Sequence, residues 1–185
     1  MAEEDPLRAL RICFHVLREE HYALVYFSQQ ALSQRIIWYT EQLSVSHPDL
    51  VLDGYVLIDR SIQWSNQWGV PGMEYMSGVE QRHWSMLDLI PRAAQKSLLI
   101  AIDACERLLM FSEDTSEIHE KTLDLWRTYM KQLEKRHTAT ARIRYSDFHA
   151  MIKDRQHPLA READAGYERC CANAILQSRT VLPIE

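Results

Sequence analysis

The chain has 185 residues, of which 46% are apolar and 25% charged, and its formal net charge is −5 at pH 7. These values are typical of a folded domain with one core; they exclude wholesale disorder and argue against a nucleic-acid surface over much of the molecule. The acidic start lacks the basic and apolar parts of a signal peptide, and no apolar run is long enough to span a membrane. We therefore expect a cytoplasmic protein.

Glycine and proline placement predicts the fold class. Four of the five glycines lie between residues 54 and 78, and neither residue type occurs between Arg92 and His157. Because these residues break regular structure, a long stretch without them predicts long helices joined by short polar turns. We predict an all-α fold, a single antiparallel bundle of about five helices over 1–185. It contains one irregular, Trp-rich connection at about 65–78 and a loose tail at about 180–185.

Two helices are predicted in the N-terminal part. Asp5 and Pro6 are typical of an N-cap and a first helical position. The apolar stripe after them runs for about 40 residues, or roughly 60 Å, and stops before Pro48. Pro48 opens a second helix that reaches about residue 62. Gly54 weakens this prediction and leaves an extended segment at 51–58 as the alternative, but we favour a helix because no partner strand is visible.

Three further helices are predicted after the irregular connection. The first covers 79–108, with a kink or a break at Pro91. The second begins after a turn, with Thr115 or Ser116 as its N-cap, and ends at the His-Pro pair of 157–158. That pair opens the last helix, whose inner side is rich in small residues, so we expect it to pack closely against its neighbours.

The four cysteines have no C-x-x-C spacing and no secretory context. We expect reduced thiols, with Cys13, Cys105 and one of the adjacent pair Cys170 and Cys171 in the core. A catalytic thiol is the disfavoured alternative.

Three histidines interrupt predicted apolar stripes, and each has a glutamate near it. On a helix, Glu-x-x-His puts a carboxylate and an imidazole on one face, as in the carboxylate-bridged di-iron and di-manganese bundles. A metal-dependent oxidoreductase is therefore an alternative function. Two of the three pairs, those of His83 and His137, have this Glu-x-x-His spacing. They lie on consecutive predicted helices and are about as frequent as chance predicts, so we favour histidines hydrogen-bonded inside or at the edge of the core. The residues are Glu20 with His21, Glu80 with His83, and Glu134 with His137.

Arg142 and Arg144 precede His149 on one predicted helix, at a spacing that resembles the RNA-cleaving HEPN family. The resemblance covers a few residues and implies a helical ribonuclease as a second alternative. His149 would act as general base for a 2′-hydroxyl, with an arginine on the phosphate. The polar residue that usually follows the arginine there is absent, since Ile143 and Tyr145 occupy those positions. An arginine whose stem packs on the bundle is the favoured interpretation.

Large aromatic and sulfur-containing side chains gather in and beside the irregular connection. Such residues are over-represented at interfaces, although they could instead fold back and cap one end of the bundle. Since no catalytic motif is present, we predict a non-catalytic helical bundle with no assigned cofactor. It would act by self-association, with a two-fold dimer favoured, or by binding another protein. The expected contact residues are Trp38, Trp64, Trp68, Met73, Tyr75 and Met76.

Overall fold

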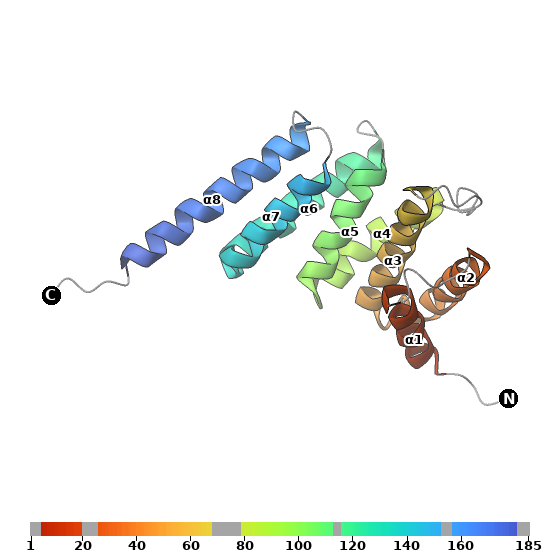
Figure 1. Ribbon diagram of the computed structural model, residues 1–185. Coiled ribbons are helices and arrows are strands. Elements are labelled where there is room, and N and C mark those ends of the chain that lie inside the picture. Colours follow the sequence, from red (N-terminus) through yellow and green to blue (C-terminus); the bar gives the residue numbers. More distant parts are fainter. Residues whose placement is uncertain (1–4, 20–25, 68–78, 113–115, 153–156, 181–185) are drawn as a thin grey trace. The chain divides into compact units, whose positions relative to one another are not determined.

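The computed structural model describes residues 5–19, 26–67, 79–112, 116–152 and 157–180 (Figure 1). These residues form eight α-helices and no strand, which confirms the predicted all-α class. The helices are α1 Pro6–Glu19, α2 Tyr26–Leu43, α3 Pro48–Gln67, α4 Val79–Ala94, α5 Leu98–Phe111, α6 Glu117–Arg136, α7 Thr138–Met151 and α8 Pro158–Thr180.

The chain forms two compact units, residues 1–122 and 123–185, and the boundary between them falls inside α6. The prediction of a single domain stays a prediction, because compactness alone does not show whether the two units unfold separately. In the described part of the chain, no helix is both long enough and apolar enough to cross a membrane.

The number of helices exceeds the predicted five because three long helices of the prediction are each divided in two. In the first, α1 and α2 pack against each other, so a single helix of about 60 Å was wrong. In the second, Pro91 lies inside α4, and the break comes after it, at 95–97. In the third, α6 ends at Arg136 and α7 starts at Thr138, with His137 between them.

Side-chain caps mark several of the helix starts. Asp5 accepts a hydrogen bond from the backbone amide of Leu7 at 3.0 Å, and Ser116 accepts one from His119 at 3.1 Å. Both residues were predicted as N-caps, and the predicted starts at Pro48 and Pro158 are also confirmed. Ser97 caps α5 in the same way. Serine thus provides a helix start where the sequence has neither glycine nor proline.

In the first unit, α3 packs on α1, α2, α4 and α5. Its Gly54 is buried, and a Cβ atom there would lie 3.0 Å from the ring of Phe14 and 3.2 Å from Ile36. The missing side chain therefore lets α1 and α2 approach α3 closely. The favoured prediction of a helix over 48–62 is confirmed, and the glycine that weakened it has a packing reason.

In the second unit, α7 packs on α8 along a row of small, buried residues. Ala160, Ala163, Gly166 and Cys170 form this row, as the predicted small inner side requires. A Cβ atom at Gly166 would collide with the ring of Tyr145. Gly166 therefore makes the room in which the phenol ring of α7 lies against the backbone of α8.

We expect Gly166→Ala to lower the free energy of unfolding by about 1–3 kcal/mol, because the added methyl group must displace the Tyr145 ring. Urea denaturation followed by circular dichroism measures this. The exposed neighbour Ala165 offers a control, since Ala165→Ser should change stability by less than about 0.5 kcal/mol. Helix propensity alone predicts that Gly166→Ala is at least as stable as the wild type. That result would contradict the packing argument.

Candidate functional site

Charged side chains lie buried where α3 packs on α4 and α5 of the first unit. Asp59 of α3, whose side chain is 3% exposed, accepts hydrogen bonds at Oδ1 from Arg82 Nε at 3.2 Å and from Arg82 Nη2 at 2.8 Å. His83 Nε2 lies 3.4 Å from the other oxygen of Asp59. Glu106 of α5 is fully buried as well. We call Asp59, Arg82, His83 and Glu106 the buried ionic cluster.

At the edge of this cluster, two further arginines meet the carboxylates of α3 and α5. Arg60 Nη2 contacts both oxygens of Asp103, at 2.8 and 2.6 Å. Burial and then the charge of Arg60 lower the pKa of Arg107, while Asp103, Asp59 and Glu106 oppose that shift. Cations and anions therefore alternate through this part of the core.

The contact between Asp59 and His83 is of a type that orients an imidazole in general acid–base sites. Here the same carboxylate is held on its other oxygen by Arg82, and the ring of Phe111 lies 6.3 Å from the imidazole ring. Oδ2 of Asp59 is buried without a hydrogen-bond partner, so the 3.4 Å approach of His83 Nε2 is not a hydrogen bond. The arrangement fits a structural ionic core.

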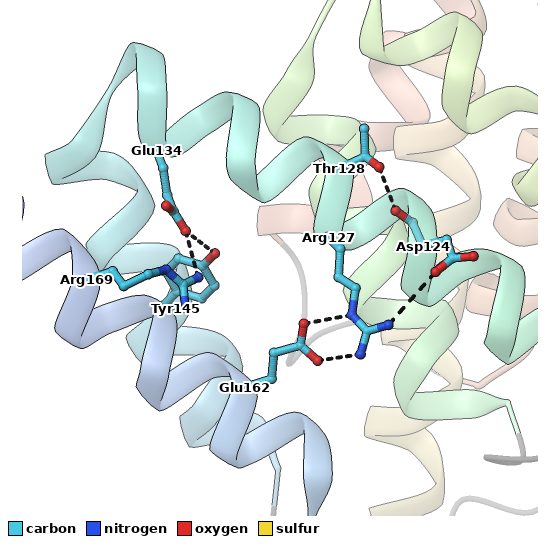
Figure 2. Close-up of polar contacts among 7 residues, drawn as sticks. All are labelled: Asp124, Arg127, Thr128, Glu134, Tyr145, Glu162 and Arg169. Carbon is cyan, nitrogen blue, oxygen red and sulfur yellow. Dashed lines mark hydrogen bonds and ion pairs between the residues drawn. The ribbon is translucent and has the colours of Figure 1, made fainter.

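In the second unit, the carboxylate of Glu134 joins α6 to α7 and α8 (Figure 2). Its Oε1 accepts hydrogen bonds from the hydroxyl of Tyr145 on α7 at 2.5 Å and from Arg169 Nη2 on α8 at 3.1 Å. Burial and the hydrogen bond to Glu134 raise the pKa of Tyr145, which keeps the phenol protonated as the donor. Burial lowers the pKa of Arg169, but the hydrogen bond to Glu134, the charge of Glu134 and the contact with Tyr145 together outweigh that effect, so the net shift is upward.

A second ion pair joins α6 to α8. Arg127 donates two hydrogen bonds to Glu162, from Nε at 2.7 Å and from Nη2 at 2.8 Å (Figure 2). The bond to Glu162 raises the pKa of the Arg127 guanidinium. Both this pair and the pair of Glu134 with Arg169 join residues 35 positions apart, so α6 and α8 run in the same direction in a fixed register.

The predicted metal ligands have the following places. His83 is buried beside Asp59, but His137, predicted for a core stripe, is exposed in the break between α6 and α7, which corrects that prediction. The carboxylate of Glu134 binds Tyr145 and Arg169. Glu20 and His21, and the side chain of Glu80, lie outside the described residues. Among those that are described, no three His, Cys, Asp or Glu side chains lie together as metal ligands would.

The residues behind the ribonuclease alternative lie on α7. His149 Nδ1 is 3.3 Å from Asp164 Oδ1 of α8, and Arg142 is exposed. Arg144 is partly buried, and its Nε atom is inaccessible to solvent. A buried arginine stem agrees with the packing interpretation of Arg144.

Of the predicted contact residues, Trp38 is described and is exposed to 56%. The side chain of Trp64, and all of Trp68, Met73, Tyr75 and Met76, lie outside the described residues. Sequence reasoning missed other exposed apolar side chains, above all Ile175 at 54% and Leu176 at 61% near the end of α8. The sequence contained a signal for this apolar segment, because residues 170–178 of that helix include no charged side chain.

We expect Arg82→Met to lower the free energy of unfolding by about 3–5 kcal/mol, because it leaves the Asp59 carboxylate buried without its donor. Arg60→Met removes a half-exposed ion pair and should cost about 0–1 kcal/mol. The double variant Asp59→Leu with Arg82→Met removes both charges and should recover most of the loss. Chemical denaturation of the four proteins tests this. An Arg82→Met protein as stable as Arg60→Met would show that the buried charge is not the cause.

The cysteines yield a second prediction. Cys13, Cys105 and Cys170 are buried and Cys171 is partly exposed, as the sequence predicted. Burial and then Glu106 raise the pKa of Cys105, which lowers its thiolate fraction further. In brief iodoacetamide labelling at about pH 8, near the ordinary thiol pKa, mass spectrometry should find Cys171 labelled first and Cys105 last. Urea-denatured protein, in which all four become reactive, is the control. Early labelling of Cys105 would contradict the described packing of α5.

The chain matches no protein-family model, no curated protein and no solved structure. Its function therefore has to be argued from its own residues and their geometry.

Proposed function

We propose that the protein acts without catalysis, by associating with a second copy of itself or by binding another protein. The observation that carries this proposal is the exposed indole of Trp38, a predicted contact residue. Tryptophan is the residue type most enriched among the side chains that dominate binding energy in protein interfaces.

The indole of Trp38 has a defined setting on α2. Its ring centroid lies 4.9 Å from that of Tyr39 in an edge-on arrangement, and the Tyr39 ring is itself buried. A ring that is held by a buried neighbour loses less conformational freedom on binding than a freely rotating one. This setting favours an anchor residue for a partner.

The turn that follows α2 is fixed by Arg92 of α4 and by Lys96, which lies in the break after α4. Arg92 Nη2 donates to the backbone carbonyls of Ser44 and Val45, at 3.0 and 3.1 Å, and Lys96 Nζ donates to that of Ser46 at 2.7 Å. These cations satisfy the carbonyl groups at the C-terminal end of α2. The turn therefore presents Val45, which is 80% exposed, on a supported backbone. A preformed apolar surface of this kind supports binding.

We expect Trp38→Ala to weaken association at least about tenfold, since truncation of a central aromatic anchor typically costs more than about 1.4 kcal/mol. Sedimentation equilibrium measures the self-association, and circular dichroism should show an unchanged helical content, because the indole is more than half exposed. Ile143→Ala, which alters an equally exposed residue of the second unit, is the matched control.

Two results would count against the proposal. A dimer with the same dissociation constant in Trp38→Ala contradicts the role of this residue. A chain that stays monomeric up to about 100 µM, a concentration that would populate even weak dimers, contradicts self-association and leaves only the second form of the proposal, another protein.

A further inference from the structure

We propose that the C-terminal end of α8 pairs antiparallel with the same segment of a second copy. The segment consists of residues 172–180, which we call the α8 extension. This inference rests on the proposed function in its self-associating form and names a surface that Trp38 does not belong to.

The α8 extension runs past the helices that pack beside it. Glu134 contacts Arg169, so Arg136, where α6 ends, is level with Cys171. In the same unit, α7 runs antiparallel to α8, since His149 meets Asp164 and Tyr145 meets Gly166, and α7 begins at Thr138. The last nine residues of α8 therefore lie beyond α6, a length of about 13 Å, and those after about residue 175 lie beyond α7 as well. Figure 1 shows this end of α8 running past α7.

The first five side chains of the α8 extension are exposed. Each residue from Ala172 to Leu176 is exposed, and these five positions cover more than a full turn. Ile175 and Leu176, at 54% and 61%, are the large apolar side chains among them. A partner that covers Ile175 and Leu176 would remove their apolar surface from water, which favours association.

The charges around the α8 extension favour a second copy as that partner. A two-fold axis brings each residue near it against its own equivalent, where a charged side chain would meet a like charge. Residues 170–178 contain no charge, so this repulsion does not arise. The stripe that contains Ile175 carries Asp164 and Glu168 on its N-terminal side, and Arg179 follows in the last turn of α8. Antiparallel pairing brings the acidic end of each copy towards the arginine of the other.

The size of the α8 extension indicates a weak dimer. A standard stable interface buries about 800 Å² per partner, and two and a half helical turns offer less. The small residue Ala172, one turn before Ile175, lets two helices approach closely, which makes good use of a short contact. We therefore expect a dissociation constant in the micromolar range.

Sedimentation equilibrium of the full chain, with Ile175→Glu and Ile143→Glu as matched variants, tests the inference. Both positions are exposed to a similar extent in the second unit, so both variants should fold and melt as the wild type does. Ile175→Glu places two like charges, one from each copy, next to the axis and should raise the dissociation constant at least about tenfold, while Ile143→Glu leaves it unchanged.

Cross-linking provides a second measurement that needs no change in the α8 extension. Cys171 lies one turn before Ile175 and is partly exposed, so antiparallel pairing about Ile175 places the two Cys171 residues on opposite sides of the two-fold axis, about 12 Å apart along the helices. A bismaleimide with a spacer long enough to bridge this separation should join two wild-type chains, and Cys171→Ser should abolish the covalent dimer.

The outcomes separate this inference from the proposed function. A dimer that is insensitive to Ile175→Glu and is not cross-linked through Cys171 overturns the role of the α8 extension. If that dimer is still weakened by Trp38→Ala, the proposed function stands. A wild-type chain that is monomeric at every concentration overturns the inference. Binding of another protein through Trp38 would then be the surviving form of the proposed function.

Discussion

Two ion pairs between α6 and α8 fix the register on which the second unit depends. Their polarity is reversed, with the arginine on α6 in one pair and on α8 in the other. If α8 slipped along α6 by two turns in one direction, Glu134 would meet Glu162. A slip of the same size in the other direction would bring Arg127 to Arg169. Both contacts are repulsive. Reversed polarity therefore specifies one register among those that apolar packing alone would tolerate. The position of the α8 extension beyond α6 is a result of this electrostatic constraint.

The two units use charge in different ways. In the second, Arg127 and Arg169 remain near the surface, and such pairs contribute little stability on their own, about 0–1 kcal/mol. In the first, Asp59 and Arg82 are removed from water, and their attraction only offsets the cost of desolvation. The net stabilisation of the first unit therefore comes from apolar packing around α3.

Local signals in the sequence predicted much of the fold but little of the site. Asp5, Pro48, Ser116 and Pro158 start helices for local reasons, and these starts are found in the structure. The break at His137 was missed because no glycine, proline or side-chain cap marks it. The contact between Asp59 and Arg82 joins residues 23 positions apart, and the exposure of Ile175 depends on where α6 ends. Both depend on tertiary packing and cannot be predicted from helical periodicity.

The buried ionic cluster also has a consequence for how the first unit opens. If α4 alone moved away, Asp59 would be left half dehydrated without Arg82, and a partly desolvated carboxylate is less favourable than a fully hydrated one. Partial opening is thus penalised relative to both the closed and the fully unfolded states. Helices α3 and α4 should then exchange their amide hydrogens as one cooperative unit, although α1 and α2 are free to fray earlier.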